Sequence, residues 1–281
     1  MRQFFDTFWH KTLQRPYRLH IGVDRGQGTP VVLLHGLGRS HIVWHHLVGL
    51  LCPADQPASG QSYRVLVPDL LGFGRSPKPE WPAYNVDDHA RSVIAALQHA
   101  RLGGPVILVG HSMGCLVAVR VAHERPDLVR HLILYEMPLF AGLPDKRRYR
   151  IRLNFYKSLY QRLVEYKPNF NLVKTPRVQR LAEKILGYTL AADVWPPFVK
   201  SLQNTILNQT THEDIKRLPM PMDVIYGTRD RVVIRGKTTE LFGEDSKNIT
   251  GHTVRESHGI TKKGSQFLLQ RIEAAATEKQ P

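Results

Sequence analysis

Short apolar runs alternate with amphipathic stretches along most of this sequence. The runs are apolar at consecutive positions and rich in β-branched residues, which is typical of parallel strands covered on both faces. We predict strands at 30–35, 63–68, 105–110, 132–135, 222–226 and 249–255, preceded by a more exposed strand at 17–23. Apolar residues three and four positions apart predict helices at 87–100, 112–123 and 264–276. This alternation indicates an α/β fold with helices on both sides of a mostly parallel sheet.

The alternation is interrupted once, after the strand predicted at 132–135. Residues 138–218 contain only helix-like stretches separated by prolines, and strand patterning resumes at Met222. We therefore expect an all-helical cap, 138–218, inserted between a first part of the α/β core at 1–137 and a second part at 219–281. A chain of 281 residues is long enough for this arrangement.

Composition adds a strong positive charge to this picture. The formal net charge is +15, and fifteen basic against six acidic residues between Leu143 and Pro219 place +9 of it in the predicted cap. A solvated helical face is the simplest interpretation, and weak association with anionic surfaces is a further expectation. No pattern indicates specific recognition of nucleic acid, and the sequence is compatible with a monomer or a homodimer.

The cysteines and histidines predict neither a disulfide framework nor a metal site. Cys52 and Cys115 are too few for a framework, and no HExxH or clustered pattern groups the fourteen histidines. The N-terminus has no basic region followed by a long apolar run, so a cytoplasmic location is expected.

The strongest local signal is GHSMG at 110–114, between a predicted strand and a predicted helix. A serine on that sharp turn is exposed at the carboxyl end of the sheet, and the flanking glycines relieve crowding around it. We therefore predict that Ser112 is a nucleophile. Cys115, further along the helix, is expected to be a small buried residue with an unreactive thiol.

A serine hydroxyl needs a histidine to take its proton and an acid to orient that histidine. Asp230 follows the strand predicted at 222–226, at the same edge of the sheet as Ser112. Of the two later histidines, His258 stands in a loop after the last strand, whereas His252 lies within that strand. We predict Asp230 and His258 as the partners of Ser112. The weaker candidates for the acid are Asp223, Glu136 and Asp245.

The negative charge of a tetrahedral intermediate needs preorganised donors, and two backbone N–H groups fit this role. The amide of Met113 follows the nucleophile at a helix start, and the amide of Leu37 comes from the HGLG loop after the strand at 30–35. Candidate substrate contacts near these donors and in the cap are His35, Gly36, His111 and Trp195. Apolar residues of the cap are candidates for an acyl pocket, although aromatic residues at helical spacing more often pack in the core of a domain. These candidates are Phe155, Tyr156, Tyr160, Leu163, Tyr188, Trp195 and Phe198.

Five segments, HGLGRSHIVW, PDLLGFGRS, GHSMG, YGTRDRVV and SHG, together resemble the α/β-hydrolase superfamily over essentially the whole chain. The resemblance implies an eight-stranded core with a helical cap after the sixth strand. It implies a triad of Ser112, Asp230 and His258, and an oxyanion hole at Leu37 and Met113.

The resemblance also implies structural roles for Asp69 and Arg75 in PDLLGFGRS, a turn that buttresses the site in the family. Relatives that open epoxides or remove halides use aspartate where this chain has Ser112, so those activities are disfavoured.

These features together predict hydrolysis of a small-molecule carboxylic ester through an acyl-enzyme, without a cofactor or a metal. The same triad serves carbon–carbon bond hydrolases, thioesterases, lactonases, lipases and amidases, because the cap distinguishes them and the triad does not. A non-catalytic ligand receptor and a basic-surface binding protein are the alternatives to an enzyme. The full set of triad candidates favours the enzyme.

Overall fold

The computed structural model describes residues 8–13, 15–53, 61–140, 142–165, 192–234, 236, 238–243 and 247–278. Its centre is a seven-stranded sheet with the order β1-β3-β2-β4-β5-β6-β7. The strands are β1 (Ile21–Gly26), β2 (Thr29–Leu34), β3 (Tyr63–Pro68), β4 (Val106–His111), β5 (Val129–Tyr135), β6 (Met222–Gly227) and β7 (Ile249–Val254). Only the β1–β3 pair is antiparallel among these strands, so the mostly parallel sheet predicted from the sequence is confirmed.

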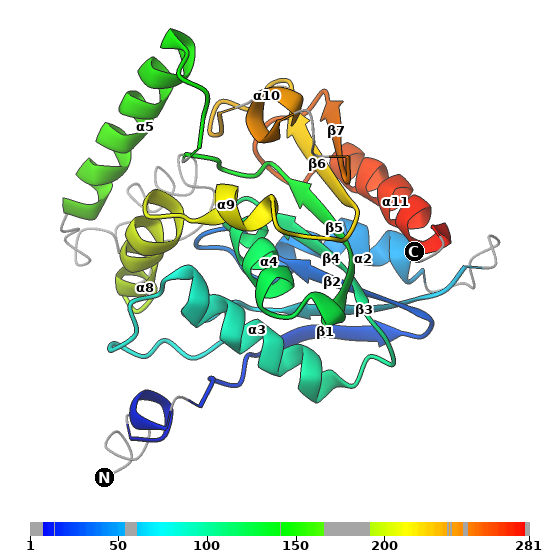
Figure 1. Cartoon of the computed structure of the whole chain (residues 1–281). Helices are drawn as coiled ribbons and strands as arrows, with labels where there is room; N and C mark the ends of the chain where they lie inside the picture. The colour runs from blue at the N-terminus through cyan, green and yellow to red at the C-terminus, as the bar shows by residue number, and fades with distance from the viewer. Residues whose placement is uncertain are drawn as a thin grey trace, which may run out of the picture.

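Helices cover both faces of the sheet (Figure 1). On one face α3 (Val86–Ala100) packs on α4 (Met113–Glu124), and on the other α2 (His45–Leu51) packs on α11 (Lys262–Thr277). Successive strand residues point to opposite faces, so Leu34 joins the apolar layer under α4 whereas Leu33 joins the layer under α11. A central strand such as β4 is therefore buried at every position, which explains its continuous apolar sequence.

The edge strand β1 differs from the prediction, because it begins at Ile21 and not at Tyr17. The backbone N–H of His20 donates to Ser76 Oγ (2.9 Å), so this residue is held by the loop after β3. Residues 15–20 run as irregular chain, although Tyr17 and Leu19 are buried. The described residues thus form seven strands where the family resemblance implies eight.

Between β5 and β6 the described residues form helices only. They are α5 (Arg147–Glu165), α8 (Trp195–Ser201), the π-helix η4 (Leu202–Leu207) and α9 (Thr211–Ile215). Residues 166–191 of the predicted cap lie outside the described part of the chain. The shorter elements elsewhere are η1 (Phe8–Thr12), η2 (His41–Trp44), η3 (Pro126–Leu128) and α10 (Thr238–Phe242). None of the described helices has the length and apolarity that crossing a bilayer requires.

Candidate active site

Ser112 stands on the turn between β4 and α4. Its backbone has φ 54° and ψ −122°, a conformation that few residues other than glycine adopt. The turn is held on both sides, because Ser112 N–H donates to the carbonyl of Tyr135 (3.0 Å) and its own carbonyl accepts from Cys115 N–H (2.9 Å). This strained turn presents the hydroxyl at the carboxyl end of the sheet.

The glycines on either side of Ser112 are required by close backbone approach. A Cβ on Gly110 would lie 2.6 Å from the backbone of Cys115, and one on Gly114 would lie 2.3 Å from the carbonyl oxygen of Leu34. Cys115 itself is fully buried and its thiol donates to the Gly110 carbonyl (3.1 Å). Burial raises the pKa of this thiol well above its ordinary value, so it stays protonated.

The structure brings Asp230, His258 and Ser112 into one hydrogen-bonded line. His258 Nδ1 lies 2.7 Å from Asp230 Oδ2, and His258 Nε2 lies 3.1 Å from Ser112 Oγ. The carboxylate requires the proton on Nδ1, which leaves Nε2 free to accept the serine proton. Asp230 Oδ1 in turn accepts from Val232 N–H (2.6 Å). Burial alone would raise the pKa of Asp230, but hydrogen bonds from His258 and Glu136 outweigh it and hold that pKa well below its ordinary value.

Glu136, one of the weaker acid candidates, lies beside the acid of this line. It is fully buried, directly follows β5 and has φ 57°. Its Oε1 accepts from Gly227 N–H (2.7 Å), and its carboxyl hydrogen-bonds to Asp230. The carboxyl groups of Glu136 and Asp230 therefore form one buried acidic pair beside His258.

Both predicted oxyanion donors lie next to Ser112. Met113 is the first residue of α4, where backbone N–H groups have no partner within the helix. Leu37 follows Gly36, and a Cβ on Gly36 would lie only 3.0 Å from Ser112 Cβ. The glycine therefore lets the Leu37 loop approach the serine, which gives it a structural reason for being there.

The two histidines proposed as substrate contacts have different surroundings. His35 is fully buried, its Nε2 accepts from Leu70 N–H (2.9 Å) and its Nδ1 donates to the Gly36 carbonyl (2.9 Å). Both of its nitrogens are hydrogen-bonded, and burial lowers its pKa to about 4. His35 is therefore neutral and holds the loop that contains Gly36 and Leu37 in place. His111 lies 5.2 Å from His258 between ring centroids, and its nitrogens have no partner in the described part of the chain. Burial, followed by the charge of His258, lowers the pKa of His111 well below its ordinary value.

The predicted pocket residues in the cap are only partly assembled. Trp195 stacks on Phe198 (5.5 Å between centroids), and Tyr156 and Tyr160 each lie 5.8 Å from Phe140. These contacts are aromatic core packing. The side chain of Phe155 points to solvent, and Tyr188 and the side chain of Leu163 lie outside the described residues.

The rival base and a rival acid bind each other away from Ser112. His252 Nε2 lies 2.6 Å from Asp223 Oδ1, and Asp223 also contacts His131 (3.1 Å) and Arg271 (3.3 Å). Hydrogen bonds from the two histidines overcome the effect of burial and lower the pKa of Asp223. The remaining acid candidate, Asp245, lies outside the described residues.

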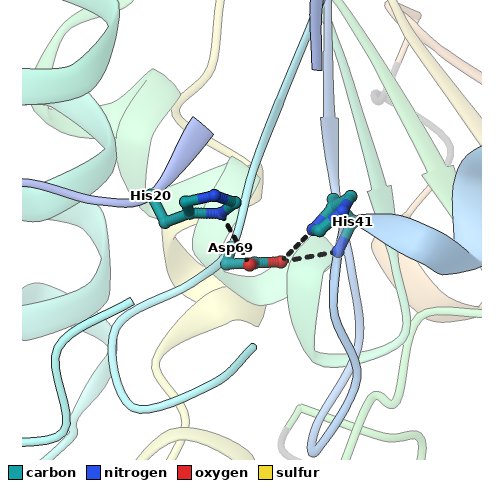
Figure 2. Close-up of side chains that lie close together, drawn as sticks. All are labelled: His20, His41 and Asp69. Carbon is teal, nitrogen blue, oxygen red and sulfur yellow. Dashed lines mark hydrogen bonds and ion pairs between the residues drawn. The ribbon is translucent and has the colours of Figure 1, made fainter. Parts of the chain in front are cut away.

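A further carboxylate–histidine cluster surrounds Asp69, and sequence patterns alone did not reveal it (Figure 2). Asp69 Oδ2 contacts His20 Nδ1 (3.0 Å), and Oδ1 contacts both the ring Nδ1 (2.9 Å) and the backbone N–H (2.7 Å) of His41. The backbone N–H of Arg75 donates to Oδ2 as well (2.9 Å). The cluster ties the segment before β1 and the end of the Leu37 loop to the turn after β3.

Comparison with known proteins agrees with this architecture. The model of the family described as Alpha/beta hydrolase family matches residues 31–260. A haloalkane dehalogenase of Mycolicibacterium paratuberculosis is 29% identical over 236 residues, which cover 78% of this chain and 74% of its own. A 2-hydroxymuconate semialdehyde hydrolase of Pseudomonas putida is 29% identical over 227 residues, covering 75% and 73%. A thermophilic esterase from Thermogutta terrifontis has a similar fold, with a TM-score of 0.63, 21% identity, and coverage of 92% of this chain and 95% of that one.

Proposed function

This chain belongs to the alpha/beta hydrolase family, and we propose that it is a serine hydrolase that cleaves carboxylic esters through an acyl-enzyme. The observation that carries the proposal is the position of His258, whose two ring nitrogens contact Asp230 (2.7 Å) and Ser112 (3.1 Å). In this arrangement Ser112 is the nucleophile, His258 the general base and Asp230 the acid that orients it.

The first half of the reaction acylates the serine. Ser112 Oγ attacks the ester carbonyl as its proton moves to His258 Nε2, and the imidazolium is stabilised by Asp230. The carbonyl oxygen becomes an oxyanion, which the amides of Leu37 and Met113 stabilise by about 3 kcal/mol each. Collapse of the intermediate breaks the C–O bond, and the alcohol leaves with the proton from His258.

The second half returns the enzyme to its starting state. His258 takes a proton from water, the hydroxide attacks the acyl carbon, and a second oxyanion forms between the same two amides. Ser112 leaves with the proton and the carboxylic acid is released. Atoms and protons balance without a cofactor or a metal.

Serine chemistry argues against halide removal, the activity in the name of one relative. Attack by a serine oxygen on an alkyl halide would produce an ether, which water does not cleave under mild conditions, so turnover would stop. An acyl ester at Ser112 is hydrolysed readily. Carbon–carbon bond, thioester and lactone hydrolysis also proceed through an acyl-enzyme and are the alternatives within this proposal.

We further propose that residues 138–218 act as one cap that selects the acyl group. The helices between β5 and β6 and the buried aromatic contacts of Tyr156, Tyr160 and Phe198 support it. Cofactor independence, a monomeric or homodimeric state and a cytoplasmic location stay predictions.

Covalent labelling with a fluorophosphonate tests the proposed nucleophile. We expect the intact protein to be labelled, Ser112→Ala to be unlabelled and His258→Ala to be labelled far more slowly, as measured by intact mass. Failure of the intact protein to react would overturn the proposal. The alternatives are then separated by comparing kcat/KM over a panel of substrates. The panel contains p-nitrophenyl esters of increasing chain length, thioesters, lactones and substrates in which a carbon–carbon bond next to a carbonyl group is cleaved.

A further inference from the structure

The helix α5 has two very different faces. On one face Tyr149 and Tyr156 are buried, and the hydroxyl of Tyr156 donates to the carbonyl of Arg231. On the other face Ile151, Phe155 and Leu159 are 58%, 63% and 43% exposed. These three residues are spaced four positions apart, so they form one apolar stripe along the helix. Figure 1 shows α5 standing away from the sheet.

The charge of α5 is almost entirely positive. The helix contains six basic residues and one acidic residue, Glu165. Arg148, Arg152 and Arg162 each stand three positions from a residue of the apolar stripe and therefore share its side of the helix. Arg148 pairs with Glu240, whereas Arg152 and Arg162 form no ion pair with other described residues. The outer face of α5 thus combines exposed apolar side chains with the guanidinium groups of Arg152 and Arg162, which form no ion pair within the described part of the chain.

We propose that this outer face of α5 binds the surface of an anionic lipid bilayer. An amphipathic helix lies in the plane of the interface, with its apolar side chains among the acyl chains and its basic side chains on lipid phosphates. At a bilayer surface, the apolar stripe and the basic side chains of this face would both be in contact with lipid. A nucleic acid would engage the arginines and leave the stripe in water. A second copy of the chain would bring two positively charged helices together.

Docking in this way has a consequence for the candidate active site. The inner face of α5 contacts the carbonyl of Arg231, the residue directly after Asp230. A bilayer bound to the outer face therefore lies one helix diameter, about 10 Å, from the loop that carries the acid. The binding inference itself does not depend on the proposed hydrolysis, because it requires no reaction at Ser112.

Vesicle co-sedimentation of the full chain tests the electrostatic part. We expect binding to vesicles of an equal mixture of phosphatidylcholine and phosphatidylglycerol, and little binding to phosphatidylcholine alone. Replacing two arginines, Arg152→Gln with Arg162→Gln, should lower the partition coefficient roughly twentyfold. The matched control, Lys262→Gln with Lys263→Gln on α11, removes the same charge from another exposed helix and should stay within about twofold. Equal binding to both kinds of vesicle, or an equal loss in the control, would overturn the proposal.

A matched pair of apolar substitutions tests the stripe. Phe155 and Ile42 are equally exposed, at 63% and 64%, on different elements. Phe155→Ser should lower the partition coefficient about tenfold, and Ile42→Ser should not. Two results would contradict the proposal. The first is a fall in the melting temperature of Phe155→Ser as large as that caused by a substitution in the hydrophobic core, which would mean that another segment of the chain covers the stripe. The second is a dimeric wild-type protein that Phe155→Ser converts to a monomer.

Discussion

Asp69 and Asp230 are both buried carboxylates that follow parallel strands, and both contact histidine. The distances are similar: 3.0 and 2.9 Å from Asp69 to His20 and His41, and 2.7 Å from Asp230 to His258. The pKa of each acid is lowered against the effect of burial by hydrogen bonds. The two clusters differ in what the second nitrogen of the histidine ring contacts.

Only one of these groups continues to a nucleophile. His258 Nε2 reaches the hydroxyl of Ser112 on a strained turn, whereas no hydroxyl or thiol among the described residues hydrogen-bonds to Nε2 of His20 or His41. Asp69 instead accepts backbone N–H groups from two loops. The carboxylate–imidazole contacts of Asp69 thus connect loops. The contact between Asp230 and His258 supports the proposed chemistry because Ser112 lies at the other nitrogen of the ring.

The largest expected difference is at the nucleophile. Ser112→Ala should lower kcat for a p-nitrophenyl ester by about 10⁵- to 10⁶-fold, because the group that forms the acyl-enzyme is lost. The melting temperature should change little, since alanine has nearly the same volume. Activity within about a hundredfold of the wild type would be incompatible with the proposed mechanism.

The same substitution in the two histidine clusters should have very different effects on catalysis. His258→Ala should lower kcat by about 10⁴-fold or more, because the serine loses its base. His41→Ala removes an identical side chain and should lower kcat less than about tenfold, through looser positioning of the Leu37 loop. Steady-state kinetics on both variants measure this; equal losses would erase the distinction between the clusters.

Stability should show the opposite pattern. Asp69→Ala leaves two backbone N–H groups and two imidazoles without their acceptor, so it should cost about 3 kcal/mol of unfolding free energy in urea denaturation. Ser112→Ala is the control and should cost less than about 1 kcal/mol. A stable Asp69→Ala protein would show that the cluster in Figure 2 does not hold these loops together.

Acid should affect the Asp69 cluster in a defined direction. The pKa of Asp69 in the folded protein lies below its ordinary value of 3.8. The unfolded chain therefore binds more protons there, so the stabilisation is complete above the ordinary pKa and is lost as pH falls through the folded pKa. Asp69→Asn cannot ionise and should lose less unfolding free energy than the wild type between about pH 5 and about pH 3. An equal loss in both proteins would assign the acid sensitivity to other groups.

The smallest expected effect concerns Glu136. If this carboxyl carries a proton and donates to Asp230, glutamine can replace it, since its amide donates to Asp230 and its carbonyl accepts from Gly227 N–H. Glu136→Gln should keep kcat within about threefold, whereas Glu136→Ala should lower it about tenfold through a poorly held acid. A glutamine variant as impaired as the alanine variant would mean that an ionised Glu136 is needed.

The features of the site that follow from the order of strands could be predicted from the sequence. Parallel strands end at one edge of the sheet, so residues in the loops that follow β4 and β6 are expected to lie together, and Ser112 and Asp230 do. Glu136 follows β5, which lies between those strands, so the same rule would have placed it in the cluster. In the sequence alone Glu136 is a weaker candidate than Asp230 because it flanks a strand pattern.

Contacts between distant segments could not be read from local patterns. The start of β1 depends on the bond between His20 and Ser76, 56 residues apart. The pairing of His252 with Asp223 depends on the register of β7 against β6. His35 looked available for substrate, but the backbone of Leu70 occupies its second nitrogen.

Trapping the acyl-enzyme would identify the nucleophile itself. The protein is mixed with a p-nitrophenyl ester, quenched in acid, digested and analysed by peptide mass spectrometry. We expect one acylated residue, Ser112, with much less acylation in His258→Ala and a normal level in His41→Ala. An acyl group on Cys115 or any other residue, or hydrolysis of the ester without any acylated peptide, would contradict it.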